Sequence, residues 1–154
     1  MAPCPPGRRR CAGFTLVEVL VAGAVLALLA ALALPAYQSQ LNRGRTARAV
    51  ADIKSIEMAM ERFMTDRGRF PDTLAEAGVT LNDPWGRPYR YLNMTGAKVG
   101  QVRKDRALHP LNTDYDLYSV GPDGKSATPL TAAISQDDIV RARNGSFVGL
   151  AKDF

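Results

Sequence analysis

The sequence predicts an α+β fold, in which a long N-terminal helix with an apolar first half packs on a small antiparallel β-sheet domain. Three observations predict it. Residues 19–34 contain no charged or polar side chain, the apolar residues that follow recur at helical spacing to about residue 66, and turn residues divide the remainder into short strand-like runs. A chain of 154 residues with this apolar segment has room for one small domain with a modest core.

The apolar segment is long enough to cross a membrane. Residues 14–36 number 23, and a helix of that length spans a hydrocarbon core of about 30 Å. Pro35 is expected to bend or locally open this helix, because proline cannot donate the backbone hydrogen bond of a helix interior. Glu18 is the only charged residue of the segment. Since an unpaired carboxylate at the centre of a bilayer costs about 2.5–3.5 kcal/mol, Glu18 requires a partner.

The same helix is expected to continue as an amphipathic second half over residues 37–67. Its apolar positions recur at steps of three and four residues, and charged residues lie between them. We therefore expect one stripe of the helix to face the globular domain: Ala49, Val50, Ile53, Ile56, Met60, Phe63 and Met64.

Residues 68–154 are expected to form a β-rich globular domain. Gly68 ends the long helix, and a short helix is expected at Thr73–Ala77 with Gly78 as its stop. Alternating or β-branched and aromatic runs bounded by turn residues predict the strands. They are Tyr89–Leu92, Tyr115–Val120 and Phe147–Leu150, with a weaker candidate at Val99–Arg103.

Charge is distributed unevenly along the chain. The net charge is +5, but residues 1–13 contain three arginines and no acid, so 17 basic and 15 acidic residues follow them. Cys4 and Cys11 lie in the same stretch, and a chain cut after Gly13 would have no disulfide. Nucleic-acid binding is not favoured, because no aromatic residues alternate with the other basic positions, and a solvated face is expected there. These positions are Arg43, Arg45, Arg48, Lys98, Arg103, Lys104 and Arg106.

The sequence does not favour an enzyme. It contains no Gly-x-Ser-x-Gly, no phosphate-binding loop and no HExxH. The single histidine, His109, stands beside a proline in a basic loop and is expected to be exposed. The turn Asp83-Pro84-Trp85-Gly86 is expected to hold Trp85 as an apolar anchor against the sheet, with ligand binding as the alternative.

The N-terminal motif resembles the processing site of type IV pilins and type II secretion pseudopilins. It consists of the basic stretch 8–10, Gly13-Phe14 and Glu18. A secretory signal would end in small residues after the apolar run, and a plain membrane anchor gives no reason for Glu18. The resemblance implies that residues 1–13 are a leader, which a prepilin peptidase removes between Gly13 and Phe14 before the Phe14 amino group is methylated. It also implies that Glu18 pairs with the N-terminus of a neighbouring subunit.

Three further segments are similar to the major pseudopilin of type II secretion systems: Phe70-Pro71, residues 83–92 and residues 114–124. The resemblance implies a type IV pilin-like fold and a structural filament subunit, with residues 14–36 as the filament core. Before assembly the chain would cross the bacterial inner membrane once, with its C-terminal domain in the periplasm, and would then enter a periplasmic or surface filament. Expected partners are copies of itself, minor pseudopilins, the prepilin peptidase and an inner-membrane assembly platform. A type IV pilus subunit for adhesion, motility or DNA uptake, or a minor tip subunit, are the alternatives.

The resemblance also implies one calcium ion, bound by Asp123, Asp137 and Asp138 with the backbone carbonyls of Leu117 and Ser119. Calcium prefers carboxylate and carbonyl oxygens. The residues alone show no EF-hand spacing and also fit solvated loop acids. Two stretches depart from the family pattern, namely a basic insertion at residues 98–106 and a stretch at 128–136 before the last acids.

Overall fold

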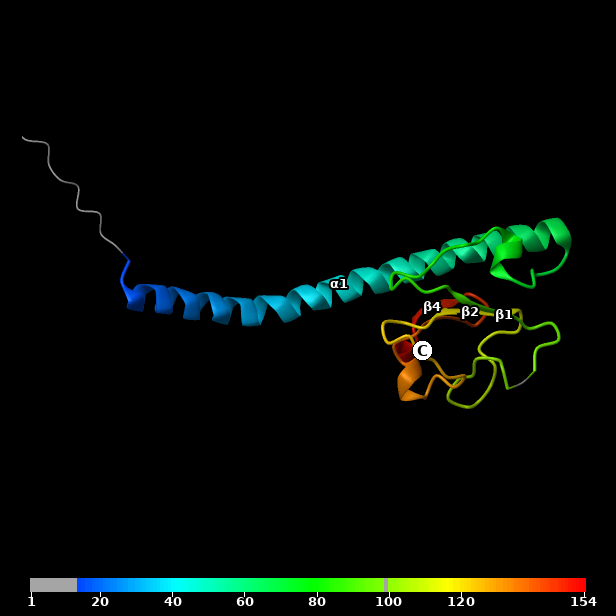
Figure 1. Ribbon diagram of the computed structural model, residues 1–154. Coiled ribbons are helices and arrows are strands. Elements are labelled where there is room, and N and C mark those ends of the chain that lie inside the picture. Colours follow the sequence, from blue (N-terminus) through cyan, green and yellow to red (C-terminus); the bar gives the residue numbers. More distant parts are fainter. Residues whose placement is uncertain (1–13, 99) are drawn as a thin grey trace, which may run out of the picture. The chain divides into compact units, whose positions relative to one another are not determined.

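The structure is a computed structural model that describes residues 14–98 and 100–154. The predicted leader, residues 1–13, lies outside the described residues. The chain divides into two compact units, one that ends at Gln40 and one at Leu41–Phe154. The second unit contains the C-terminal part of helix α1 and a four-stranded sheet (Figure 1).

Helix α1 covers Leu16–Arg67, which confirms the predicted single long helix. The helix continues through Pro35 without interruption. At its start, the Thr15 hydroxyl accepts a hydrogen bond from the Glu18 backbone N–H (3.2 Å) and satisfies one of the free donors of the first turn. At its end, Gly68 has a φ of +69° and donates its N–H to the Met64 carbonyl (2.9 Å), as expected for a glycine that stops a helix.

The sheet contains strands β1 (Arg90–Asn93), β2 (Tyr115–Ser119), β3 (Ile139–Ala142) and β4 (Phe147–Leu150) in the order β1-β2-β3-β4. Every neighbouring pair is antiparallel. The three main strand predictions are confirmed to within a residue or two. The weaker candidate at 99–103 is wrong, because residues 100–102 form a turn and a bend; residue 99 lies outside the described residues. Strand β3 was not predicted.

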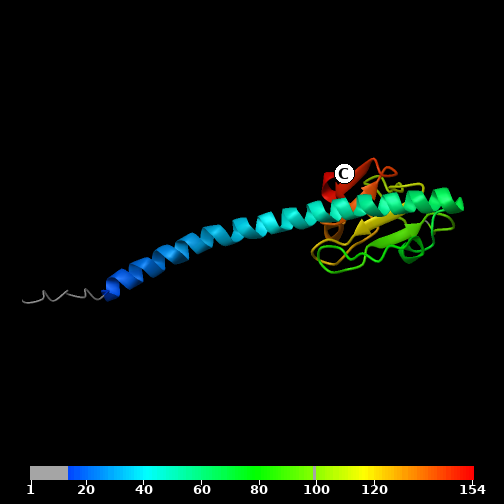
Figure 2. The same ribbon diagram turned by 90° about the horizontal axis from the view of Figure 1, so that it is seen from above.

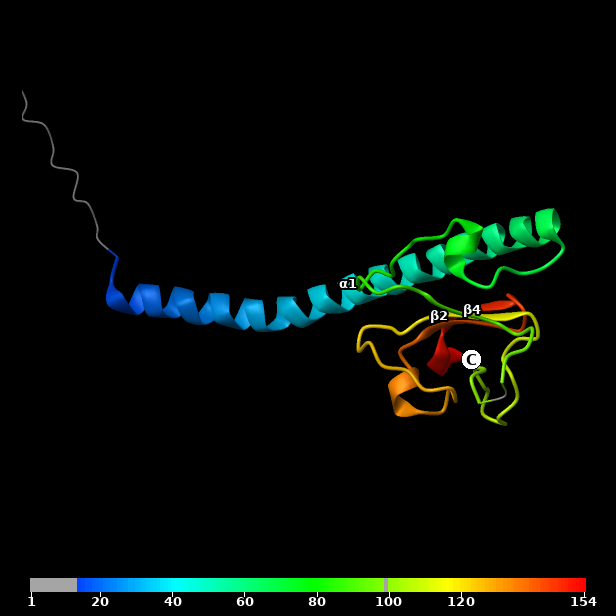
Figure 3. The ribbon, with the colours of Figure 1, turned by 45° about the vertical axis from the view of Figure 1, so that its right-hand side comes forward.

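Both faces of the sheet are covered. On one face lies the C-terminal part of α1, which crosses the strands (Figures 1 and 2). On the other face lie loops and the 3₁₀ helices η2 (Ala133–Ser135) and η3 (Ala151–Asp153) (Figure 3). The two clusters of buried apolar residues follow this division: Ala49, Ile53, Ile56, Met60, Tyr89, Tyr115, Leu117 and Ile139 toward α1, and Leu111, Leu130, Val140, Ala142 and Ala151 opposite.

The apolar stripe of α1 is confirmed for the four residues of that helix in the first cluster. It ends before Met64, whose side chain is 40% exposed. Glu57 lies within the buried stripe although a polar, exposed position was expected. The short helix before β1 is the 3₁₀ helix η1 (Leu74–Ala77), one residue shorter than predicted because Thr73 is its N-cap; Gly78 stops it, as predicted.

Candidate functional site

The N-terminal half of α1 is the first candidate site. All residues from 14 to 36 are exposed, and α1 is the one helix of the described residues that is long and apolar enough to cross a membrane. Glu18 lies in its first turn and has no ion-pair partner among the residues that the structure describes. Gly13 lies outside the described residues, so the expected cleavage site stays a prediction.

The second candidate site is the loop that follows β2. A tight turn at residues 121–124 brings the backbone N–H of Asp123 to the Asp137 carboxylate (3.3 Å). Gly121 has a φ of +64°, and a Cβ on it would collide with the Asp137 carbonyl. The turn therefore packs directly on the backbone of the segment before β3, with no room for a side chain between them. Asp123 is exposed and Asp137 is half-buried. The structure therefore brings these two predicted ligands together.

The third predicted acid, Asp138, is bound to Arg103 and Ser126. Its side chain is fully buried, and its Oδ2 accepts hydrogen bonds from the Arg103 guanidinium (2.6 Å) and from the Ser126 hydroxyl (2.6 Å). Burial raises the pKa of the Asp138 carboxyl to about 6, against the lowering effects of the Ser126 hydrogen bond and the Arg103 charge. Its Oδ1 has no hydrogen-bond partner among the described residues.

Arg103 corrects an expectation from the sequence, because it is buried rather than part of a solvated basic face. Its side chain is 3% exposed and lies over the Tyr118 ring, with Cζ 4.3 Å from the ring centroid. It also donates to the Ser126 hydroxyl and to the Ala127 carbonyl (2.8 Å). Its own backbone N–H donates to Asp116 Oδ2 (2.6 Å). The basic insertion is thus tied into the domain.

The other two predicted calcium ligands, the backbone carbonyls of Leu117 and Ser119, belong to strand β2, and the side chains of both residues are occupied elsewhere. The Leu117 side chain is buried in the cluster that faces α1, and the buried Ser119 hydroxyl donates to Asp83 Oδ2 (2.6 Å). Across residues 14–98 and 100–154, no group of three or more His, Cys, Asp and Glu side chains is arranged to hold a metal ion. Calcium binding stays a prediction of the resemblance, and the described side chains do not fit the predicted three-acid site.

The turn before β1 behaves as predicted. Asp83 is buried, and its Oδ1 accepts from the backbone N–H groups of Trp85 (3.0 Å) and Arg87 (2.8 Å). Trp85 is partly buried against the core cluster that faces α1. His109 is exposed, as expected, and its Nδ1 lies 3.8 Å from Asp105 Oδ2.

One buried polar network was missed by the sequence reasoning. Arg141, in β3, donates to Glu57 of α1 (2.7 Å) and forms two parallel bonds with the Asp114 carboxylate (2.8 and 2.7 Å). The sequence does contain a signal for this part of the sheet. The pair Asn144-Gly145 stands between two short apolar runs, and such a pair is typical of a β-hairpin. Recognising that hairpin would have predicted β3 and placed Arg141 in the sheet.

Known proteins resemble the chain over most of its length. The family described as "Prokaryotic N-terminal methylation motif" matches residues 8–34. The type II secretion system core protein G of Pseudomonas aeruginosa is 30% identical over 140 residues, which cover 77% of this chain and 88% of the relative. The protein of the same name from Aeromonas hydrophila is 29% identical over 143 residues, covering 79% and 90%.

A type IV major pilin protein, PilE1 of Neisseria gonorrhoeae, is 34% identical over 90 residues, covering 58% of this chain and 54% of the relative. No solved structure matches the chain. The similarity to the core protein G sequences extends over most of both chains. The chain therefore belongs to the family of the type II secretion system core protein G.

Proposed function

We propose that this protein is the major pseudopilin of a type II secretion system, a structural subunit that polymerises through its N-terminal helix into a periplasmic pseudopilus. The observation that supports this most directly is the exposed apolar half of α1 in a member of the core protein G family. Residues 14–36 present apolar surface on every side, so they require either lipid or copies of the same helix around them. The chain would act as a substrate of a processing enzyme and has no catalytic role of its own.

Processing would come first. The arginines of residues 8–10 would keep the leader in the cytoplasm, so the helix would cross the inner membrane once with the C-terminal domain in the periplasm. A prepilin peptidase would then cut between Gly13 and Phe14, and the new amino group would be methylated. Intact-mass measurement of the protein from its native host is expected to show residues 14–154 plus one methyl group. A mature N-terminus after Ala36, or an uncut chain, would contradict this.

Glu18 would set the register of the filament. It is a carboxylate in an apolar segment, where an unpaired charge costs about 2.5–3.5 kcal/mol at the centre of a bilayer. The positively charged N-terminus of a neighbouring Phe14 is the partner that processing would create. Because a buried charge without its partner is strongly penalised, a subunit would enter the filament only at the position where this pair forms.

Filament assembly in cells tests the role of Glu18. The variant Glu18→Ala is expected to reduce filament yield sharply, while the melting temperature of the soluble domain, the unit Leu41–Phe154, stays unchanged. Glu61→Ala is the matched control, because Glu61 is an exposed carboxylate on the same helix outside the apolar segment. Normal filament yield from Glu18→Ala would rule out the register function.

A type IV pilus subunit is the second candidate, and the similarity to the gonococcal major pilin favours it. The two functions differ in what a deletion strain loses. Loss of exported proteins from the culture medium, with surface pili unchanged, would support the pseudopilin. Loss of surface pili with normal secretion would support the pilin. Either filament would require minor subunits and an inner-membrane assembly platform as partners.

A further inference from the structure

The loop after β2 gathers oxygen atoms of the kind that bind a divalent cation. The carbonyls of Gly121 and Pro122 and the carboxylates of Asp137 and Asp138 belong to this loop and to the segment packed on it. Carboxylate and carbonyl oxygens are the ligands that calcium prefers. In this chain, however, several of these oxygens already have cationic partners from the protein itself.

Arg103 is the partner of Asp138. The guanidinium lies 2.6 Å from Asp138 Oδ2, and both side chains are buried, with exposures of 3% and 0%. A calcium ion would need to lie about 2.3–2.6 Å from a ligand oxygen. At that distance from Oδ2 the calcium ion would either displace the guanidinium or lie next to it, where two positive charges would repel each other in a buried site. Displacement would also break the hydrogen bonds of Arg103 to Ser126 and Ala127.

The free oxygen of Asp138 does not restore the site. Asp138 Oδ1 is buried without a hydrogen-bond partner among the described residues, and it shares its carboxyl group with the oxygen that Arg103 holds. Asp138 can therefore supply at most one of the six to eight oxygen ligands that calcium takes.

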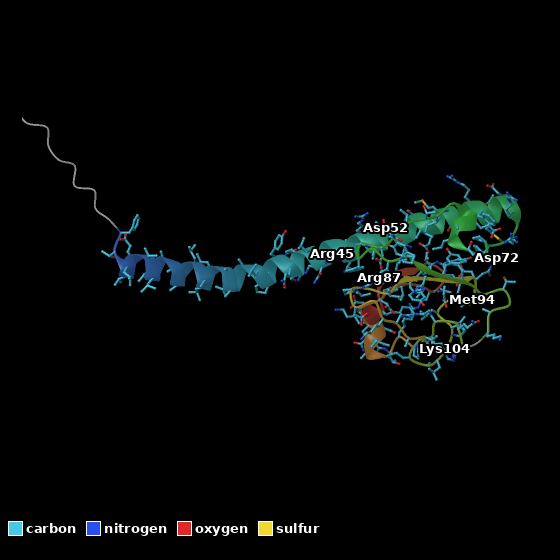
Figure 4. All side chains as sticks on the ribbon, viewed as in Figure 1. Arg45, Asp52, Asp72, Arg87, Met94 and Lys104 are labelled. Atoms are coloured by element: carbon cyan, nitrogen blue, oxygen red, sulfur yellow. The ribbon has the colours of Figure 1, made fainter. Side chains whose placement is uncertain are left out.

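Arg87 is the partner of the turn carbonyls. Its guanidinium donates to the Gly121 carbonyl and to the Pro122 carbonyl (3.2 Å). The turn closes on this group, since a Cβ on Gly124 would come within 2.7 Å of Arg87 Cζ. Arg87 reaches the turn from the segment before β1, away from Lys104 of the basic insertion (Figure 4). Arg87 thus holds the carbonyls of the turn, and Arg103 holds Asp138 of the segment packed on it.

We propose that Arg103 takes, in this protein, the place beside Asp138 that the family resemblance gives to calcium, while Arg87 holds the neighbouring carbonyls of the turn. The basic insertion supplies Arg103, which neutralises Asp138 and links the insertion to the segment before β3. Arg87 gathers the carbonyls of the turn. The soluble domain then reaches its full stability without a divalent cation. This inference concerns the loop alone and does not depend on which filament the protein builds.

Thermal melts of the full chain in detergent micelles test the first consequence. Trp85 is the single tryptophan and lies in the soluble domain, so its fluorescence reports the unfolding of that domain. The midpoint is expected to be the same in calcium chloride, in magnesium chloride and in EGTA. A ligand at 100 times its dissociation constant raises the midpoint of a small domain by about 10 °C or more. A midpoint in calcium that exceeds the EGTA midpoint by that amount would overturn the proposal, whether or not magnesium has the same effect.

Substitution at Arg103 tests the second consequence, at about pH 8, where the Asp138 carboxyl is ionised. Arg103→Met is expected to lower the midpoint in EGTA, because it leaves a buried carboxylate without its positive partner. Adding Asp138→Asn to this variant removes that charge and is expected to recover part of the loss. Lys104→Met is the control, since Lys104 is a neighbouring basic residue of the same insertion whose side chain forms no ion pair within the described residues.

Two results would refute the role of Arg103. One is an Arg103→Met midpoint equal to that of the parent, and the other is a double variant no more stable than Arg103→Met alone. If Arg103→Met does not fold, Arg103→Lys keeps the positive charge and is expected to fold and to melt independently of calcium. A calcium-dependent midpoint for Arg103→Lys would count against the proposal.

Discussion

Arg141 joins helix α1 to the sheet, and its removal is expected to destabilise the soluble domain strongly. Its side chain is 5% exposed and bonds Glu57 of α1 and Asp114 beside β2, and it lies over the Tyr115 ring with Cζ 4.0 Å from the centroid. Breaking a buried ion pair by removing one partner costs about 3–5 kcal/mol. Because Lys54 also contacts Glu57 (3.0 Å) and would keep part of its charge paired, we expect about 3 kcal/mol, at the low end of that range, for Arg141→Met.

Urea unfolding of the full chain in detergent, followed by tryptophan fluorescence, measures this loss. About 3 kcal/mol corresponds to a midpoint lowered by roughly 12 °C in a thermal melt of a domain of this size. Arg90→Met is the control, because Arg90 is an exposed arginine of β1 in the same sheet. In a double-mutant cycle with Glu57→Gln, a coupling of about 1–3 kcal/mol is expected for side chains in direct contact. If Arg141→Met is as stable as Arg90→Met, or if the cycle shows no coupling, then the ion pair between Arg141 and Glu57 does not stabilise the domain as argued.

Two further substitutions test the loops. Asp83→Ala removes the acceptor of two backbone N–H groups and of the Ser119 hydroxyl, and it is expected to lower the free energy of unfolding by about 2–3 kcal/mol in a urea titration followed by circular dichroism. Asp83→Asn keeps an acceptor oxygen and is expected to lose less, so equal losses would contradict the hydrogen-bond argument. Gly121→Ala is expected to cost at least about 1–3 kcal/mol by the same measurement, because φ is +64° and the new Cβ would meet the Asp137 carbonyl. Gly100→Ala is its control, since that glycine has open space around it, and equal effects at the two glycines would contradict the strain.

Local signals in the sequence were sufficient for the long helix and its ends. Apolar residues at steps of three and four predicted which stripe of α1 faces the sheet, and Ile53 and Ile56 are fully buried as expected. Gly68 and Gly78 were predicted as helix stops, and each adopts a positive φ that other residues rarely take. Both inferences concern residues that lie close together in the chain.

The buried charges could not be predicted in this way. Arg103 and Asp138 are 35 residues apart, and Glu57 and Arg141 are 84 apart. A lysine- and arginine-rich insertion indicates a solvated loop unless the position of its acidic partner is known. Strand β3 was missed for a related reason, since it has four residues and one of them is an arginine, so its alternation is too short to predict a strand by itself.

The two buried arginines, Arg141 and Arg103, lie on opposite faces of the sheet. Tyr115 and Tyr118 are three residues apart in β2, so their rings point to opposite faces of the sheet. Arg141 stacks on Tyr115 on the face toward α1, and Arg103 stacks on Tyr118 on the other face. Each arginine also pairs with an acid from a distant segment, Glu57 of α1 for Arg141 and Asp138 for Arg103. Strand β2 is therefore linked to α1 on one face and to the loops on the other. A small domain has limited apolar area to bury. Because an ion pair forms only between particular side chains, these pairs fix which segments pack together, whereas apolar contacts tolerate other arrangements.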